Sequence, residues 1–387
     1  MCNLIGLAVR QALTRRGFIP RSVVGASLIA PMCSAVAGDR SLDARIQLAQ
    51  SSGDVANSKT WLILSKALAS FVGLLALLLG ATVSTQVRAD SDFKVTLLGT
   101  GTPVPIPDRF GPSTLVEAGN QKLLFDAGRG ATIRLRQISA TKGTGTIMTK
   151  IDALFLTHYH SDHTLGIPDL WLTGWLGMSR KEPFRLIGPV GAKSLMTNLE
   201  SAYALDIKIR LEDEKLPPEG IATVVEEFEK DGIVYDKDGV KVIAFTVDHG
   251  EAIKPAVGYR IEYKGRAVVI SGDTRYNQNV IKYSSGVDLL IHEVCIARPE
   301  LLSSSDYNRR VMAHHTSPQE AGQVFSLAKP KLAVFSHLVF LRGSAAPPTV
   351  DDIVAGTRET YDGPLQVGVD LMSFEIGDTV IVSQPKP

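Results

Sequence analysis

Cysteine is scarce in this sequence, which has three cysteines in 387 residues. Cys2 and Cys33 lie among the first 89 residues, so Cys295 is the only cysteine in the rest of the chain. A single cysteine cannot form an internal disulfide, which excludes a disulfide-stabilised scaffold for residues 90–387. Because Cys295 lies between Val294 and Ile296, we expect it to be a small buried side chain.

Histidine is absent from the first 157 residues, and all eight histidines lie between positions 158 and 337. Three of them, His158, His160 and His163, occur with Asp162 within six residues. The apolar run 153–156 just before them predicts a buried strand that ends in this polar turn. Imidazole nitrogen and carboxylate oxygen suit zinc and similar divalent ions. We therefore interpret the stretch as a metal site rather than as a loop that is rich in histidine by chance.

A strong excess of charge is also absent, since the formal net charge is +1. The two signs are unevenly distributed along the chain. Residues 1–89 hold nine of the 41 basic residues and three of the 40 acidic ones, which leaves 32 basic and 37 acidic residues in 90–387. A mildly acidic body argues against a broad nucleic-acid-binding face.

The first 89 residues are expected to form an export leader. Thr14-Arg15-Arg16-Gly17-Phe18-Ile19 precedes a moderately apolar stretch and resembles a bacterial twin-arginine signal. Residues 66–89 form a second candidate, with a basic start, an uncharged apolar stretch and a small-residue cleavage pattern. Either the second signal is the true one and the start lies too far upstream, or residues 61–83 span the membrane as an anchor. Both alternatives predict an exported, periplasmic protein.

Residues 90–387 are interpreted as one domain. The 44% hydrophobic and 21% charged content is that of a globular protein, and no low-complexity linker interrupts the segment. Each half has several strand-like runs and its own helices, which predicts two packed sheets with helices outside. The expected strands are Lys94–Leu98, Thr114–Glu117, Lys122–Phe125, Asp152–Leu156, Lys241–Val247, Ala256–Glu262, Ala267–Ile270, Val287–Ile291 and Leu332–Phe335. The expected helices are Gly128–Ile138, Leu165–Leu176, Lys193–Leu205 and Pro318–Ala328.

Further candidate metal ligands follow strand-like runs, at the position where open α/β sheets usually place their sites. His249, Asp273 and His337 each occupy such a position. A lone histidine after a strand is weak evidence, because it is more often a surface residue. Together with the cluster at 158–163, however, these residues supply seven ligands, a suitable set for two ions. Asp273 is the expected bridge, because a carboxylate can give one oxygen to each ion and an imidazole cannot.

Five motifs together carry a family resemblance. They are Leu97-Leu98-Gly99-Thr100-Gly101-Thr102-Pro103, the pattern H-x-H-x-D-H at 158–163, Ser271-Gly272-Asp273-Thr274, His292-Glu293 and His315-Thr316-Ser317. With them the chain resembles hydrolases of the metallo-β-lactamase fold, in the branch of tRNase Z and the zinc-dependent arylsulfatase- and phosphodiesterase-like enzymes. The resemblance runs from residue 97 to about residue 337. It implies an α/β fold in four layers, an αββα sandwich.

The resemblance also implies a binuclear centre that binds two Zn²⁺ ions per chain, with Mn²⁺ or Fe²⁺ as alternatives. The ions would be held by His158, His160 and His249 on one side, by Asp162, His163 and His337 on the other, and by Asp273 between them.

Two residues are expected to act in catalysis, His315 and the ligand Asp162. His315 is the candidate proton donor to the leaving group, because His-Thr-Ser has that role in the branch. Two alternatives stay open, since His315 could instead mark the entry of a helix and His314 could take its role. Asp126, in a D-x-G turn, and the pair His292-Glu293 are expected to orient the metal ligands.

These features predict a hydrolase of phosphodiester or aryl sulfate esters, with a hydroxide between the two ions as the nucleophile. tRNase Z carries a protruding arm rich in glycine and basic residues, whereas the corresponding region here, about 205–239, contains Glu212-Asp213-Glu214 and few lysines. We therefore expect a small-molecule ester substrate and no nucleic-acid partner. The alternatives are a tRNase Z-like endoribonuclease that processes the 3′ end of tRNA, a lactonase, and a metal-binding or sensing protein without activity. Whether the chain forms a homodimer is left open.

Overall fold

The computed structural model describes residues 92–142, 147–343 and 346–385. These residues belong to one compact unit, Arg88–Pro387. The export leader expected in residues 1–89 lies outside the described residues. Among the described helices, none combines the length and the apolar character that a membrane span requires.

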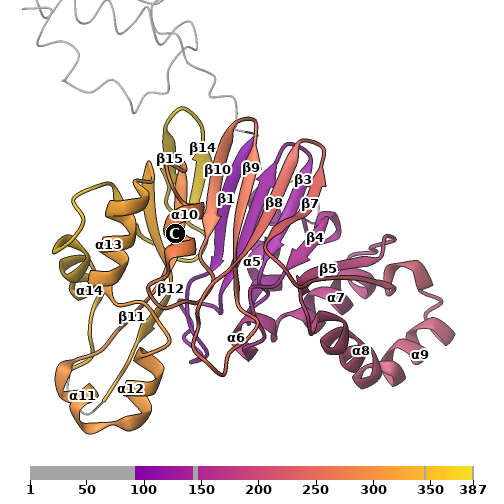
Figure 1. Ribbon diagram of the computed structural model, residues 1–387. Helices are drawn as coiled ribbons and strands as arrows, with labels where there is room; N and C mark the ends of the chain where they lie inside the picture. The colour runs from indigo at the N-terminus through magenta and orange to yellow at the C-terminus, as the bar shows by residue number, and fades with distance from the viewer. Residues whose placement is uncertain (1–91, 143–146, 344–345, 386–387) are drawn as a thin grey trace, which may run out of the picture. The chain divides into compact units, whose positions relative to one another are not determined.

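The first sheet is mixed and has eight strands in the described part of the chain (Figure 1). In spatial order they are β15 (Val380–Ser383), β14 (Ser373–Ile376), β1 (Phe93–Gly99), β2 (Ser113–Ala118), β3 (Gln121–Phe125), β4 (Ala153–Phe155), β5 (Phe184–Pro189) and β6 (Thr223–Phe228). Strands β1 to β3 pair antiparallel, and β3 to β6 pair parallel. The His-rich stretch follows β4, at the edge where the parallel strands end.

The second sheet is also mixed, with seven strands among the described residues. In spatial order they are β13 (Leu365–Val367), β12 (Leu332–Phe340), β11 (Leu289–Ile296), β10 (Arg266–Ile270), β9 (Val257–Tyr263), β8 (Val240–Thr246) and β7 (Gly232–Lys237). Strands β7 to β10 form an antiparallel meander, and β10 to β13 are parallel. The parallel halves of both sheets thus supply the strand ends at which His and Asp side chains follow.

The two sheets pack face to face through a shared hydrophobic core. The rings of Phe125 and Phe155 in the first sheet stack with centroids 4.9 Å apart, and both contact Tyr259 of the second sheet. On β8, Val242 and Ala244 are fully buried while Ile243 between them is less so, as expected for alternating faces. Burial of each large apolar side chain contributes roughly 1.5–3 kcal/mol, which holds the sheets together.

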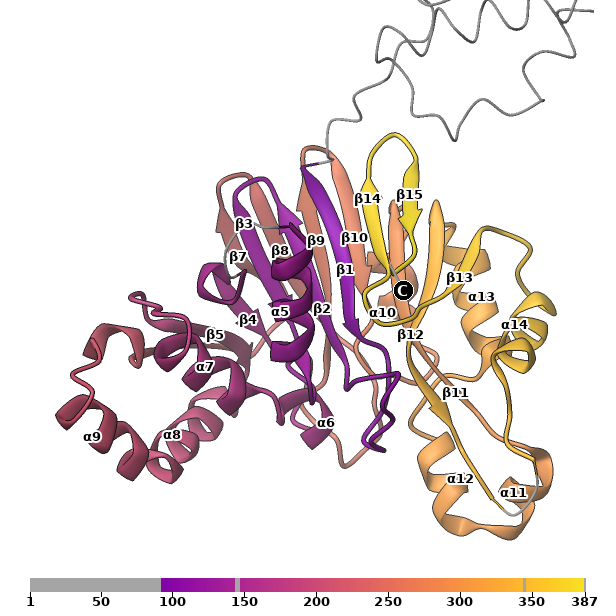
Figure 2. The same cartoon turned by 180° about the vertical axis from the view of Figure 1, so that it is seen from behind.

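Helices cover both outer faces (Figures 1 and 2). On the first sheet lie α5 (Ala131–Lys142), α7 (Ile167–Leu176) and α8 (Ala192–Ala202), and on the second α10 (Gln278–Tyr283), α13 (Pro318–Ala328) and α14 (Val350–Arg358). The remaining helices are α6 (Ser161–Thr164), α9 (Ala204–Glu212), α11 (Pro299–Ser304), α12 (Asp306–Met312) and the short 3-10 turns η2 (Ile147–Lys150) and η3 (Pro218–Gly220). The layers are helix, sheet, sheet, helix, so the predicted αββα sandwich is confirmed.

The predicted strands and helices are present, although β5, β13 to β15, α10 to α12 and α14 were not predicted. Three differences concern segments that the sequence analysis did describe. The helix expected over Lys193–Leu205 is two helices, because the chain turns at Tyr203 (φ −99°, ψ 6°). Strands β11 and β12 run on to Ile296 and Phe340, several residues further than predicted. Residues 205–239, expected to correspond to an arm, form α9, η3, β6 and β7.

Candidate metal centre

The seven predicted ligands come together at the edge where the parallel strands of both sheets end. They form two groups, in each of which one ligand atom per residue lies within 4.8 Å of all the others. The groups are His158, His160, His249 and Asp273, and Asp162, His163 and His337. All are buried except His160, which is partly exposed. Segments more than 170 residues apart thus converge on one small volume.

Asp273 lies between the groups. Its Oδ2 atom is 3.9 Å from His158 Nε2 and 3.7 Å from His249 Nε2 in the first group. The same atom is 3.4 Å from His163 Nε2 and 3.2 Å from His337 Nε2 in the second. One carboxylate oxygen therefore faces four imidazole nitrogens, which is the arrangement expected of a bridging residue.

The residues fit a divalent cation, because two buried imidazole nitrogens that face the centre make no hydrogen bond. Among the described residues, His158 Nε2 and His163 Nε2, which both face Asp273, make no hydrogen bond. An unpaired buried polar atom costs about 1–3 kcal/mol. Nitrogen and carboxylate oxygen are the donors that zinc prefers in proteins, so a bound ion would satisfy these atoms.

The charges at the site point the same way. Burial disfavours an ionised Asp273, but the charges of His337 and His163 hold its pKa well below the usual value. Burial lowers the pKa of a histidine, yet Asp273 raises the pKa of His337 to about 9. In contrast, burial and the charge of His163 lower the pKa of His158 well below 6.5. Without an ion, protons on two histidines would balance the carboxylates, and metal binding would displace them.

Side chains next to the candidate ligands fix the orientation of their rings. Asp126 Oδ2 accepts a hydrogen bond from His163 Nδ1 at 2.8 Å and another from the Thr157 hydroxyl at 2.8 Å. The same hydroxyl lies 3.0 Å from His158 Nδ1. Gly128 completes the turn, because a Cβ there would lie 2.6 Å from the carbonyl oxygen of Asp162. This explains the D-x-G pattern at 126–128, while the role of Thr157 could not be inferred from the sequence.

His315 lies beside both groups without belonging to either. Its ring centroid is 5.0 Å from that of His249 and 5.7 Å from that of His337. His315 Nδ1 is 3.2 Å from Glu293 Oε2, while Glu293 Oε1 accepts a hydrogen bond from Thr316 N at 2.9 Å. The Glu293 carboxylate thus lies between His315 and the backbone N–H groups of Thr274 and Thr316.

Ser317, His314 and His292 each have a contact that defines their role near His315. Helix α13 is capped by Ser317, whose hydroxyl accepts from Glu320 N, so His315 does not cap it. The carbonyl oxygen of His314 accepts a hydrogen bond from His249 Nδ1 at 2.7 Å. His292, expected to orient a ligand, packs instead against Phe325 of α13 with ring centroids 5.8 Å apart. No hydrogen bond joins His292 to any of the seven in the described residues, so that expectation is wrong.

A further support was missed by sequence reasoning because its parts lie far apart in the chain. The carboxylate of Asp370 accepts hydrogen bonds from Thr100 N, Thr100 Oγ1 and Phe110 N at 2.8–2.9 Å. The carbonyl oxygen of Thr100 accepts in turn from Leu338 N at 3.0 Å. Leu338 follows His337, whose backbone is in the left-handed region (φ 46°). The Gly-Thr-Gly-Thr-Pro motif therefore helps to hold His337 in place.

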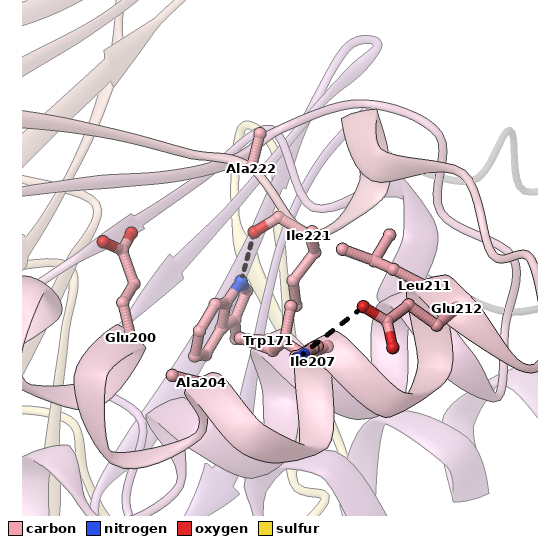
Figure 3. Close-up of a pocket in the computed structure, with 9 residues that line it drawn as sticks. Trp171, Glu200, Ala204, Ile207, Leu211, Glu212, Ile221 and Ala222 are labelled. Atoms are coloured by element: carbon pink, nitrogen blue, oxygen red, sulfur yellow. Dashed lines mark hydrogen bonds and ion pairs between the residues drawn. The ribbon is translucent and has the colours of Figure 1, made fainter.

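An open cavity of about 460 Å³ lies away from this centre, between α7, α8, α9 and the chain before β6 (Figure 3). The Trp171 indole at its floor donates to the carbonyl oxygen of Ile221 at 2.9 Å. Ala204, Ile207 and Leu211 of α9 form one wall. None of the seven candidate ligands lines this cavity.

Together, the αββα sandwich and the seven-residue centre define a metal-dependent hydrolase of the metallo-β-lactamase class. Residues 121–338 match the family described as the beta-lactamase superfamily domain. The chain belongs to this superfamily, and its relatives place it in the branch of ribonuclease Z. It is a metal-dependent hydrolase that acts on phosphoester bonds.

The relatives include two ribonucleases Z. The chain is 33% identical over 290 residues to ribonuclease Z of Mycolicibacterium gilvum, across 73% of this chain and 96% of the relative. It is 36% identical over 298 residues to ribonuclease Z of Mycolicibacterium paratuberculosis, across 73% and 98%. In fold it is similar to the metallo-beta-lactamase fold protein YhfI from Bacillus subtilis (TM-score 0.54, 20% identity, 73% and 98% coverage). The short form of human tRNase Z is similar to the same degree (TM-score 0.54, 23% identity, 73% and 99% coverage).

These relatives correct two predictions. A ribonuclease acts on RNA, so the expectation that nucleic acid is excluded as a partner, in favour of a small-molecule ester, is wrong. It failed because net charge averages over the whole surface, and because residues 205–239 are folded into α9, β6 and β7. An exported protein would rarely meet an RNA precursor, so the prediction of a periplasmic location is overturned by the same finding.

Proposed function

We propose that this chain is a metal-dependent endoribonuclease that cleaves a phosphodiester bond in tRNA precursors. The ribonuclease Z relatives match it over 96% and 98% of their own length. The single observation that carries the metal dependence is the convergence of four imidazole nitrogens on Asp273 Oδ2. Small phosphodiesters share the bond that is cleaved, whereas nothing in the relatives' names points to sulfate esters.

The residues that would hold the metal are the two groups described above. His158, His160 and His249 would hold one ion and Asp162, His163 and His337 the other, with Asp273 between them. Zinc suits this donor set best, with Mn²⁺ or Fe²⁺ as alternatives. When bound, such ions polarise a phosphoryl oxygen and lower the pKa of water.

The chain's own contribution is to orient and to move protons. Asp126 directs the Nε2 atom of His163 into the centre, because it occupies Nδ1. Glu293 Oε2 lies 3.2 Å from His315 Nδ1, and the backbone N–H groups of Thr274 and Thr316 donate to its other oxygen. A proton on His315 Nε2 would then pass to the leaving oxygen as its bond to phosphorus breaks. Asp162 Oδ2 lies 3.2 Å from His337 Nε2, which holds these two residues of the second group together.

The test is a substrate panel for the purified chain. Precursor tRNA, bis-p-nitrophenyl phosphate, an aryl sulfate and a lactone are incubated with and without EDTA, and with Zn²⁺ or Mn²⁺ added back. We expect cleavage of the precursor at a defined position, loss of all turnover with EDTA, and recovery with metal. Turnover of the small esters without cleavage of the precursor under any metal would refute the RNA substrate. No turnover of any substrate would favour a metal-binding protein without activity.

A further inference from the structure

Beside the metal centre, α11 and α12 form a helical hairpin on the continuation of β11 and β12 (Figure 1). After an irregularity between His292 and Val294, residues 294–296 of β11 pair with residues 338–340 of β12. The hairpin packs on this extension through Leu301, Val311 and Met312, against Cys295, Val339 and Leu341. It has a small hydrophobic core of its own, which fixes its orientation.

The C-terminal end of α12 reaches the candidate metal ligands. Ala313 N and His314 N still donate to the carbonyl oxygens of Arg309 and Val311, at 2.9 and 3.3 Å, so the helical turn continues to His314. The His314 ring lies 4.9 Å from that of His249, and its carbonyl oxygen accepts from His249 Nδ1 at 2.7 Å. The helix therefore begins away from the centre and ends at it.

Tyr307, Arg310 and His314 have the spacing i, i+3 and i+7, which places them along one face of the helical turn. Tyr307 is 67% exposed, and Arg310 is exposed. Neither side chain has a hydrogen bond or an ion pair to any described residue. The neighbouring Arg309, in contrast, is paired with Asp306. Tyr307 and Arg310 thus lie on the face of α12 that leads to the candidate metal centre, and neither side chain makes a polar contact that would stabilise the described fold.

We propose that Tyr307 and Arg310 bind single-stranded nucleotides next to the cleaved bond, the ring stacking on a base and the guanidinium binding a phosphate. This inference rests on the proposed function. Aromatic rings and basic side chains in one groove are how proteins hold single strands without reading their sequence. At about 1.5 Å per residue, Arg310 and Tyr307 lie about 6 and 10 Å along the helix from His314. Two or three nucleotides of a stacked strand, about 3.4 Å each, cover this length.

The experiment compares variants of the full chain, loaded with metal, in their cleavage of precursor tRNA. Tyr307→Ala is expected to raise KM on the order of tenfold, while Tyr307→Phe stays near wild type, because stacking does not need the hydroxyl. Arg310→Ala is expected to raise KM and to reduce the slope of log KM against log salt by about 0.7, the value for one phosphate of a single strand. Arg310→Lys should restore the slope, and Tyr307→Ala should not change it.

The matched control is Arg136→Ala. It also removes an exposed guanidinium without a partner among the described residues, but from α5 on the outer face of the first sheet. KM and salt slope are expected to equal those of wild type. The ratio of RNA turnover to bis-p-nitrophenyl phosphate turnover should fall in Tyr307→Ala and Arg310→Ala but not in Arg136→Ala.

Three results would overturn the inference. If wild type cleaves the precursor and Tyr307→Ala and Arg310→Ala cleave it with the same KM, the two residues do not bind RNA, while the proposed function stands. If wild type cleaves no RNA, the proposed function fails and this inference fails with it. If the variants that show a raised KM are also partly unfolded at the assay temperature, as measured by thermal unfolding, the side chains stabilise the fold rather than bind RNA.

Discussion

Asp126→Asn is expected to weaken metal binding at both groups, although Asp126 is not a ligand. A carboxylate can only accept hydrogen bonds, so it determines where the protons of its partners lie. His163 must donate from Nδ1, at 2.8 Å, which leaves the lone pair of Nε2 free for an ion. The Thr157 hydroxyl must also donate to Asp126, so it accepts from His158 Nδ1 at 3.0 Å. The Nε2 lone pair of His158 is thereby free as well.

An asparagine at this position fits the backbone, but it places a hydrogen-bond donor where Asp126 has an acceptor. Asp126 has φ 57°, a left-handed conformation that asparagine tolerates well. If its amide oxygen keeps the hydrogen bond from Thr157 N (2.8 Å), its NH₂ group faces His163 Nδ1 and favours a proton on Nε2. If the amide flips, the NH₂ group faces Thr157 N–H instead, and two donors meet. Either arrangement costs about 1–3 kcal/mol, and loss of such a partner lowers metal affinity about 10–100-fold.

The assay is competition for Zn²⁺ against a chromophoric chelator, with wild type and Asp126→Asn at equal folded fraction. Thr157→Ser is the matched control, since it keeps the hydroxyl that links Asp126 to His158. Thr157→Val removes only that link and should weaken binding less than Asp126→Asn. An affinity of Asp126→Asn within twofold of wild type would refute the argument that Asp126 sets the proton positions.

Three further outcomes are expected. Asp273→Ala should lose bound metal and activity, whereas His292→Ala should keep its metal per folded molecule, as measured by metal analysis; equal losses would show that the bridge is assigned wrongly. His315→Ala should keep both ions but lower turnover roughly 10²–10⁴-fold. The loss should be smallest for esters whose leaving group is p-nitrophenolate. If turnover depends on the pKa of the leaving group equally in wild type and variant, His315 is not the proton donor. Asp352, whose pKa is lowered by hydrogen bonds from Thr349 and Arg298, should stabilise the fold above its ordinary pKa of 3.8 and cease to do so as pH falls through the lowered value. The difference in Tm between wild type and Asp352→Asn should therefore vanish in acid, and a constant difference would contradict this.

The candidate site could be predicted from the sequence to the extent that its signals are local. The cluster at 158–163 holds four of the seven residues within one turn, and His249, Asp273 and His337 each follow a run that forms a strand. The strands themselves were recognisable because their apolar runs are short and bounded by turn residues. Supports that depend on distant pairing were not predictable. Thr100 and Asp370 are 270 residues apart, and no local pattern joins them.

His292 and His337 show that the same sequence pattern can place two histidines differently. Both follow an apolar run, and both runs continue as strand beyond the histidine. His292 keeps an ordinary place in β11 and packs toward α13. His337 adopts a left-handed backbone (φ 46°), which breaks the alternation of faces and turns its ring to Asp162, 3.2 Å away. The sequence pattern does not show which of the two histidines adopts this conformation, because the unfavourable backbone depends on contacts elsewhere.

The same continuation of β11 and β12 connects the metal centre with the proposed RNA-binding residues. It carries His337 at its start, next to Leu338, whose N–H is held by Thr100. Further along, it supports the hairpin of α11 and α12 through Cys295, Val339 and Leu341. The hairpin then returns the chain to His249 through His314. Because β12 carries His337 and supports the hairpin that contains α12, an RNA strand bound along the exposed face of α12 would lie in fixed register with the centre. Positioning of this kind is the main contribution a protein makes to a reaction whose charge is neutralised by metal.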